Sequence, residues 1–443
     1  MSDDGGESTT GPRQMRDRFT FLLIVTATFG LQFLTLVTGI IMARLLGVEG
    51  RGLIALVIAV GLFASQLTLG GSLPAALTKL VAERQVAARD GLRTFARRRA
   101  WIVLLPCLVA AGLMPVLQHS DTEADTLATA VIVFVVTFQT LVFQVLAGCL
   151  QGEGRFVRMA WVALAPQGMF TAILGTVAVA GWSWNAYEVL VAYLVTGLAS
   201  VWFAYRSLLP ARGTPEDEIP EDAVWSESRG NYVSSVRPLD GLGLDRILVG
   251  SLLGTVPLGL FATALAVSNL CRLVSNAVRV VVLPRVAMHQ ADPVAQRAVI
   301  RRWVGITVML ATVIVLVLEA LVAPVIRLAF GEEFVGAVAC ARWLIVADGL
   351  LAVRSVLISV LQGQGRGGVA SWVELALVPV LLIGIVVAAQ HESLVGVGVT
   401  LVSVGLLSCL ALGWAVSRGP RARGRHTGSR GTVLGRRRST VSS

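Results

Sequence analysis

The sequence predicts an all-α integral membrane protein, with about twelve transmembrane helices in two parallel six-helix lobes around a central cavity. Three observations lead to this fold class. Of the 443 residues, 55% are hydrophobic and only 14% are charged. The apolar residues form blocks of about 20, the length that a helix needs to cross a hydrocarbon core of roughly 30 Å. The second half of the chain also repeats motifs of the first.

The same pattern excludes two other classes. A transmembrane β-barrel would show alternating segments of about 10 residues. A disordered chain combines low hydrophobicity with high charge, whereas the mean hydropathy here is +0.76.

Twelve apolar blocks are expected to span the membrane. The first runs from Phe19 to Ala43 without a small-residue cleavage site, so we expect a retained helix and not a signal peptide. The spans begin near Phe19, Gly52, Ala100, Leu127, Val157, Ala186, Leu239, Leu258, Trp303, Gly336, Val369 and Leu394.

Three pairs of motifs define an internal repeat. The segment 150–155 (LQGEGR) returns at 361–366 (LQGQGR), and the Leu-Leu-Gly of 45–47 returns at 252–254. Leu73-Pro74 returns as Leu283-Pro284, so the register is kept within a few residues. Each half holds six spans, an even number, and the halves therefore enter the membrane in the same sense, as parallel repeats do in transporters.

The repeat and the composition together divide the chain into five parts. Residues 1–18 form a cytoplasmic arm, 19–208 the N-lobe with spans 1–6, and 238–417 the C-lobe with spans 7–12. A polar cytoplasmic linker, 209–237, joins the lobes. Residues 418–443 carry many arginines and no apolar periodicity, so they are expected to be a disordered cytoplasmic tail near anionic lipid headgroups.

The basic residues set the orientation. When the odd-to-even connections are placed outside, only Arg44, Arg51 and Arg327 lie there, and nearly all other loop arginines lie inside. Both termini are then cytoplasmic, in a multi-pass protein of the cell membrane. The net charge of +10 follows from this topology, and no nucleic-acid partner is expected.

No catalytic, metal or cofactor motif is recognisable. The five cysteines and four histidines are isolated, and no Gly-rich loop ends in Gly-Lys-Ser or Gly-Lys-Thr. The longest outer loop, 118–126, is too short to hold a glycosyltransferase site. We therefore expect a transporter and not an enzyme, with no cofactor and with energy from a gradient or an outside source.

Polar stripes on apolar spans indicate where the cavity lies, because lipid-facing surfaces exclude ionisable groups. In span 8 the spacing of four, three and four places four side chains on one helix face: Ser268, Arg272, Ser275 and Arg279. The repeat maps them onto span 2 as Gly61, Ser65, Thr68 and Ser72. Span 4 carries Thr137, Thr140, Gln144 and Gln151, three of which map onto Asp348, Ser355 and Gln362 of span 10.

The ionisable residues at membrane depth all belong to the C-lobe: Asp245, Arg246, Arg272, Arg279, Glu319, Arg342, Asp348, Arg354 and Glu374. Each would cost about 3 kcal/mol if it faced lipid, so they must be paired or hydrated. Two interpretations stay open for Glu319, Arg342, Arg354 and Glu374: interhelical ion pairs or cavity groups. Arg272 and Asp348 share depth and stripe, and we expect them to pair.

Several of these segments carry a family resemblance. The runs 244–254 (LDRILVGSLLG), 259–262 (GLFA) and 283–287 (LPRVA) are similar to those of Wzx-type oligosaccharide flippases of the MOP superfamily, as are 43–47 (ARLLG), 50–52 (GRG) and 330–334 (FGEEF). The resemblance implies alternating-access transport of an undecaprenyl-diphosphate-linked oligosaccharide from the inner to the outer face. It also implies other polysaccharide-assembly proteins as partners. Lipid II flippases and cation-coupled MATE-type exporters share the fold and remain alternatives.

The site residues follow from the stripes and this cargo. Guanidinium groups donate paired hydrogen bonds to phosphate, so Arg272, Arg279 and Arg246 form the expected anion site, with Ser268 and Ser275 beside them. Asp348 and Asp245 are either coupling groups for H+ or Na+ or structural charges. The neutral stripes of the N-lobe are expected to hydrogen-bond sugar hydroxyls through Ser65, Thr68, Ser72, Thr140 and Gln144.

Overall fold

The structure, a computed structural model, is helical throughout the part of the chain that it describes, as the sequence predicts. The described residues are 11–66, 72–84, 88–117, 123–209, 221–235, 239, 242–272, 278, 282, 286, 288, 292–364 and 366–418. Eight helices in these segments are long and apolar enough to cross a membrane. One of them, Thr26–Ser65, covers most of the first predicted span and reaches into the second.

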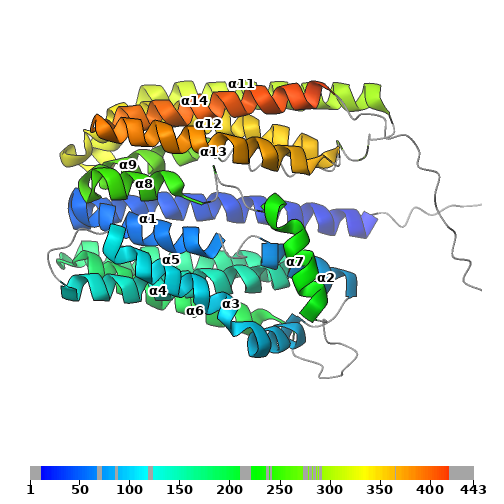
Figure 1. Ribbon diagram of the computed structural model, residues 1–443, viewed down its shortest axis with the longest axis horizontal. Helices are drawn as coiled ribbons and strands as arrows, with labels where there is room; N and C mark the ends of the chain where they lie inside the picture. Colours follow the sequence, from blue (N-terminus) through cyan, green and yellow to red (C-terminus); the bar gives the residue numbers. More distant parts are fainter. Residues whose placement is uncertain are drawn as a thin grey trace, which may run out of the picture.

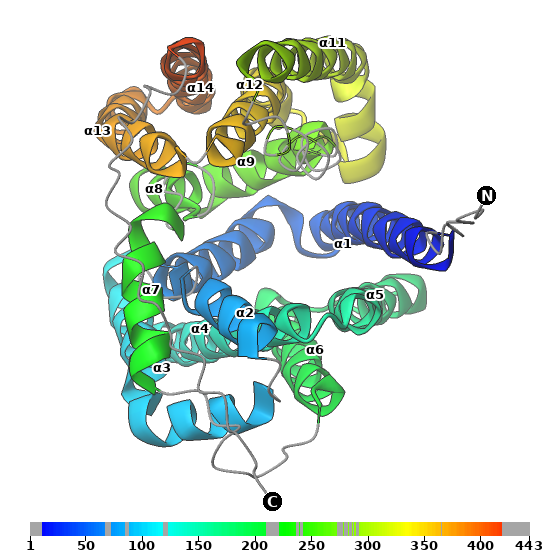
Figure 2. The ribbon, with the colours of Figure 1, turned by 90° about the vertical axis from the view of Figure 1, so that its right-hand side faces the viewer.

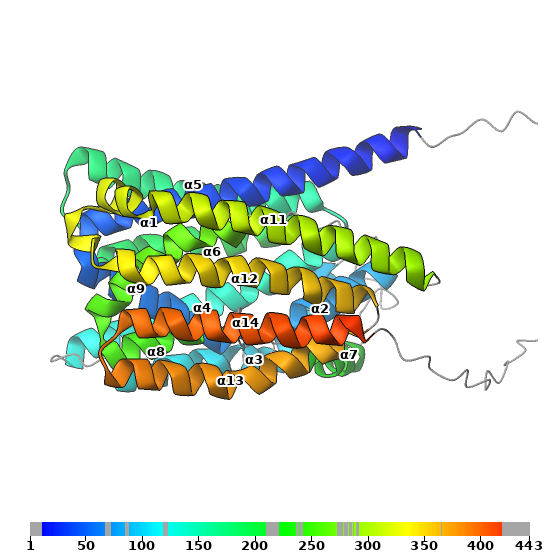
Figure 3. The ribbon, with the colours of Figure 1, turned by 90° about the horizontal axis from the view of Figure 1, so that it is seen from above.

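Two groups of helices lie on either side of a long central helix, α1 (Figure 1). The N-lobe contains α1 (Gly11–Ser65), α2 (Ser72–Arg84), α3 (Ala88–Leu117), α4 (Glu123–Gly152), α5 (Phe156–Ala180) and α6 (Ala186–Ser207). The C-lobe contains α8 (Leu244–Leu253), α9 (Thr255–Ser268), α11 (Pro293–Val325), α12 (Ala337–Gly363), α13 (Gly367–Gln390) and α14 (Leu394–Ser417). Seen from above, α11, α12, α14 and α13 lie side by side in that order (Figure 3).

Helix α1 consists of two helical stretches that meet at Gly47. This glycine has φ 66° and ψ −169°, a conformation that side chains with a Cβ rarely adopt. Arg51 donates a hydrogen bond to the carbonyl of Gly39, although twelve residues of straight helix would separate the two by about 18 Å. The chain therefore folds back at Gly47, and Figure 2 shows the two stretches as separate coils.

The same turn occurs in the C-lobe, at the position that the repeat predicts. Gly254 has φ 94° and joins α8 to α9 as Gly47 joins the two stretches of α1. The Leu-Leu-Gly motif thus ends one helix in each lobe. The internal repeat of the sequence is thus preserved in the local backbone structure.

The lobes meet where the second stretch of α1 crosses α9. A Cβ added to Gly52 would overlap the carbonyl oxygen of Thr255, and a Cβ added to Gly259 would overlap that of Val48. The repeat relates these two contacts, since it maps 48 onto 255 and 52 onto 259. Only glycine permits both helix backbones to approach this closely.

Two arginines strengthen this end of the interface. Arg51 was expected in an outer loop, but its side chain is buried, donates across the interface to the Ala262 carbonyl at 3.3 Å and lies 5.2 Å from the centre of the Phe330 ring. Arg44 donates to the carbonyls of Leu328 and Ala329 at 2.5 and 2.8 Å. Those carbonyls belong to η4 (Ile326–Phe330), a π-helical turn.

Helix α11 begins about ten residues before the predicted span. Its first ten residues include Gln296 and three arginines, but Asp292 caps the helix by accepting from the amides of Val294 and Ala295, and Pro293 occupies the first turn. Hydropathy locates the buried part of a span, whereas capping sets where the helix starts. Helix α1 likewise begins at Gly11 and not at Phe19.

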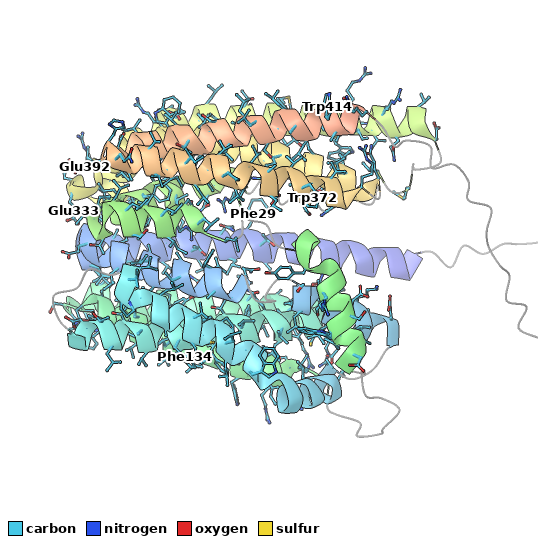
Figure 4. The ribbon with its side chains drawn as sticks, in the orientation of Figure 1. Phe29, Phe134, Glu333, Trp372, Glu392 and Trp414 are labelled. Carbon is cyan, nitrogen blue, oxygen red and sulfur yellow. The ribbon has the colours of Figure 1, made fainter. Side chains whose placement is uncertain are left out.

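Two exposed tryptophans lie near the ends of C-lobe helices. Trp372 lies near the start of α13 and Trp414 near the end of α14, both toward the end of the molecule opposite Glu333 and Glu392 (Figure 4). Tryptophan is enriched at membrane interfaces. This distribution fits helices that cross a bilayer along the long axis of the molecule.

The linker that was expected to be merely polar contains a helix, α7 (Glu221–Ser235). It packs against α2, α3 and α13, so it touches both lobes, and in Figure 2 it runs along one side of the bundle. Val224 is buried, and Trp225 and Tyr232 lie partly buried beside it. Burial raises the pKa of the Tyr232 hydroxyl.

Lys79 on α2 forms a salt bridge with α7. Its ammonium donates to the Glu227 carboxylate at 2.7 Å, and this hydrogen bond raises the pKa of the lysine. Because the folded pKa lies above the unfolded one, the pair is complete below the ordinary lysine pKa of about 10.4 and is lost as the pH rises through the raised value.

Lys79 is the only lysine of the chain, so its reactivity can be followed alone. We expect an amine-acylating reagent to modify Lys79 more slowly in the native protein than in Glu227→Gln, because less free amine is present at a given pH. Peptide mass spectrometry across pH 8–10 measures this rate. Equal rates in the two proteins would show that the pair does not hold α7.

Candidate functional site

Four of the charged C-lobe residues line one small cavity, here called the C-lobe pocket. Asp245 comes from α8, Arg272 from the end of the turn that follows α9, and Asp348 and Arg354 from α12. The cavity measures about 60 Å³, enough for a few water molecules or a small ion. It is completed by Leu239, Leu265, Leu344, Ala347, Leu351, Leu381, Leu401, Val404 and Gly405.

The expected pairing of Arg272 with Asp348 is confirmed. Arg272 Nε lies 3.2 Å from Asp348 Oδ1. The carboxylate is nearly buried, whereas the Arg272 side chain is 32% exposed. Oδ2 of Asp348 is buried and has no hydrogen-bond partner in the structure, so this carboxylate retains an acceptor for a proton, a cation or water.

Glu319, Arg342, Arg354 and Glu374 form interhelical ion pairs, one of the two interpretations that the sequence left open for these four residues. Arg354 on α12 lies 2.7 Å from Glu374 on α13, and both side chains are at most 4% exposed. Arg342 on α12 lies 3.9 Å from Glu319 on α11, where both are more exposed. Arg354 of the first pair also lines the C-lobe pocket.

A larger cavity, the N-lobe pocket, lies among α1, α4, α5 and α6. It measures about 260 Å³ and contains Thr140, one of the predicted sugar-binding residues. Its lining is a mixture of amides, hydroxyls and aromatic rings: Leu31, Gln139, Thr140, Phe143, Ala163, Pro166, Gln167, Phe170, Tyr193, Thr196, Gly197 and Ser200.

The remaining predicted residues lie apart from these cavities. Ser65 and Ser268 are fully buried and donate to carbonyls of their own helices, those of Leu62 and Leu265. Ser72 is also buried, and its hydroxyl has no hydrogen-bond partner. Gln144 accepts from Gln66 at 3.4 Å.

Arg246 lies on α8 and is half-buried, and its Nε has no hydrogen-bond partner among the described residues. Thr68, Ser275 and Arg279 lie outside the described residues, as do residues 1–10 and 419–443.

Sequence reasoning missed several lining residues of the N-lobe pocket. Gln139 lies on a helix face that shows no polar stripe, because its neighbours one turn away are apolar. Tyr193, Thr196 and Ser200 follow a helical spacing on α6 that the sequence analysis did not use. A usable signal was Pro166 inside span 5, since a proline in a transmembrane helix leaves a carbonyl that needs a partner. The Val162 carbonyl is that group, and Ser200 donates to it at 3.4 Å.

Comparison with protein families gives one match. The profile of a family described as "Polysaccharide biosynthesis protein" matches residues 41–339, more than half of the chain. No curated protein matches the sequence.

Solved structures of transporters share the fold. Lipid II flippase MurJ in an inward closed conformation aligns over 90% of this chain and 88% of its own, with TM-score 0.68 and 14% identity. An inward-facing multidrug resistance MATE family transporter of the MOP superfamily aligns over 88% and 95%, with TM-score 0.64 and 14% identity. An outward-facing MATE transporter gives TM-score 0.56 over 90% and 94%, with 15% identity.

Proposed function

The chain belongs to the polysaccharide biosynthesis protein family, and from this premise we propose that it is a lipid-linked oligosaccharide flippase. Its cargo is an undecaprenyl-diphosphate-linked oligosaccharide, carried from the inner to the outer face of the cytoplasmic membrane by alternating access. The observation that carries the proposal is the C-lobe pocket, where a partly exposed arginine meets acidic groups inside a membrane-spanning bundle. The activity is transport and not catalysis.

The orientation rests on the basic residues. With both termini cytoplasmic, the crossing at Gly52 and Gly259 lies at the outer end, beside Glu333. The close glycine contacts then seal the outer side. We infer from this orientation a state that is closed to the outside, from which the cargo would enter on the cytoplasmic side.

Arg272 is the proposed anion-binding group. Its planar guanidinium donates several hydrogen bonds in fixed directions, which suits the oxygens of a diphosphate. Asp348 holds it in place at 3.2 Å. Arg279 and Arg246 are proposed to complete the site, and Ser275 to border it.

Asp348 is the proposed coupling group. Protonation of Asp348, or binding of Na+ at its Oδ2, weakens its attraction for Arg272 and leaves the guanidinium available to the diphosphate. Asp245 lines the same pocket, so the same change of charge alters the electrostatic potential at its carboxylate. Binding of H+ or Na+ would thus alternate with binding of the anionic headgroup.

A substitution of Arg272 by Lys tests the anion site. The charge remains but the paired donors are lost, so we expect export to fall about tenfold, the effect of one charge-assisted hydrogen bond of roughly 1.5 kcal/mol. Arg342→Lys is the matched control, since Arg342 lies outside the pocket and pairs only loosely with Glu319.

The measurement uses a strain that lacks the gene. We expect lipid-linked oligosaccharide to accumulate on its cytoplasmic face, to be cleared by the wild-type protein and by Arg342→Lys, and to persist with Arg272→Lys at equal expression. Absence of any accumulation in the deletion strain would overturn the proposed cargo. Full clearance by Arg272→Lys would remove Arg272 from the site.

A further inference from the structure

The N-lobe pocket has the chemistry of a binding site for an uncharged ligand. Gln139, Thr140, Gln167, Tyr193, Thr196 and Ser200 bring two amides and four hydroxyls to its wall. Each amide offers donors and an acceptor, and each hydroxyl offers both. None of the described residues that line it carries a carboxylate, ammonium or guanidinium group.

Gln139 is the lining residue whose unpaired hydrogen-bond acceptor indicates a ligand. Its side chain is 4% exposed, and its carbonyl oxygen Oε1 is buried without a hydrogen-bond partner. A buried acceptor left unpaired costs free energy, so such groups are normally satisfied. A ligand in the pocket on which Gln139 borders would supply the missing donor.

Gly197 on the neighbouring helix leaves room for the Gln139 side-chain amide. A Cβ on Gly197 of α6 would lie 2.5 Å from three atoms of the Gln139 side chain, so the amide occupies this position only because residue 197 has no side chain. The carbonyl that Pro166 leaves unbonded in α5 is already served by Ser200. Among the described residues that line the cavity, Gln139 thus keeps a buried acceptor without a hydrogen-bond partner.

The two pockets occupy equivalent places in the two repeats. The offset of 211 residues that relates the Leu-Gln-Gly motifs maps Thr140, Phe143, Phe170 and Tyr193 onto Leu351, Arg354, Leu381 and Val404. All eight residues line the pockets. Phe143 stands where the C-lobe has Arg354, so one repeat has a charged pocket and the other a neutral, aromatic one.

We propose that the N-lobe pocket binds one neutral sugar ring of the transported oligosaccharide. Mixed hydrogen-bond donors and acceptors suit sugar hydroxyls, and the aromatic side chains Phe143, Phe170 and Tyr193 offer apolar surface to the ring's carbon face. The volume of about 260 Å³ exceeds what a single water needs. This inference rests on the proposed flippase function and adds where the glycan is held.

The probe for this site is the glycan itself without its lipid. Mild acid releases the oligosaccharide from the lipid that the deletion strain accumulates. Saturation-transfer NMR with the full-length protein in detergent then reports which sugar protons contact the protein. We expect transfer concentrated on one sugar residue, and an affinity about tenfold lower in Gln139→Leu, equivalent to about 1.4 kcal/mol.

Two further variants make the result specific. Gln296→Leu is the matched control, because Gln296 is also a buried glutamine but lies on α11 and donates to the Val286 carbonyl; it should bind as the wild type does. Tyr193→Phe removes only a hydroxyl and is expected to weaken binding even if Gln139→Leu does not fold.

Each outcome of this experiment supports or overturns the proposed sugar site. Focused transfer that is lost in Gln139→Leu or Tyr193→Phe supports the pocket. Accumulated lipid-linked oligosaccharide whose glycan shows no transfer to the wild-type protein overturns the pocket and leaves the flippase function standing. Equal affinity of the wild type and both pocket variants overturns it as well. A deletion strain without accumulated lipid-linked oligosaccharide overturns both proposals.

Discussion

Replacing Glu374 by Gln is expected to lower the free energy of unfolding by about 3–5 kcal/mol, the cost of leaving one buried charge without its partner. The Arg354 and Glu374 side chains lie 2.7 Å apart and are 2% and 4% exposed. The pair joins α12 to α13 beside the C-lobe pocket. Equilibrium unfolding in mixed detergent measures the change.

Two comparisons identify the cause. The double change Arg354→Leu with Glu374→Leu removes both charges and should restore most of the lost stability, because a buried ion pair is often replaceable by apolar residues. Glu319→Gln in the more exposed pair with Arg342 should change the stability by only about 0–1 kcal/mol. A double variant as unstable as Glu374→Gln would refute the pairing.

Replacing Gly52 or Gly259 by Ala is expected to abolish export. An added methyl group at either position overlaps a backbone carbonyl of the opposite helix, so α1 and α9 cannot cross as they do. The overpacking should also cost about 1–3 kcal/mol of stability. Export by the complemented deletion strain and the unfolding midpoint are the two measurements.

Gly305→Ala provides the control for this pair. Nothing lies within 4 Å of a Cβ at Gly305, which is inside α11. Alanine there should leave export unchanged and stabilise the helix by about 0.5–1 kcal/mol. Wild-type export by Gly52→Ala or Gly259→Ala would show that transport does not need the tight crossing.

Much of the fold follows from simple patterns in the sequence. Apolar blocks of membrane length predict the helices, and the repeated Leu-Leu-Gly motif locates equivalent turns at Gly47 and Gly254. Arg272 and Asp348 were predictable as a pair, because a charge at membrane depth needs a partner and the two share a level. The boundaries of the five chain segments stay predictions.

The remainder depends on tertiary packing. Arg51 was expected in an outer loop, yet it lies in α1 and is buried where carbonyls of both lobes accept its hydrogen bonds. Helix α7 was missed because its apolar residues are few and cover only one short face. Ser65 lies on the polar stripe predicted for span 2 and Ser268 on that of span 8. In the structure both side chains are buried within the lobes.

The cavities were also beyond the reach of helix patterns. Both pockets lie inside a lobe among four or more helices. Where one helix contributes several residues, they follow helical spacing, but many of these residues are apolar, so a search for polar stripes does not find the pockets. Their relation appears only when the repeat offset is applied to the lining residues. The contrast between a neutral and a charged pocket is then visible position by position.

The most direct measurement of the central proposal is translocation by the purified protein. Lipid-linked oligosaccharide from the deletion strain is reconstituted with the protein into vesicles, and an impermeant glycosidase added outside reports how much glycan becomes accessible. We predict that inner-leaflet lipid becomes accessible in vesicles that contain the wild-type protein, slowly with Arg272→Lys, and not without protein. Inner-leaflet lipid that stays protected in the presence of folded wild-type protein, with and without H+ and Na+ gradients, would contradict the flippase function.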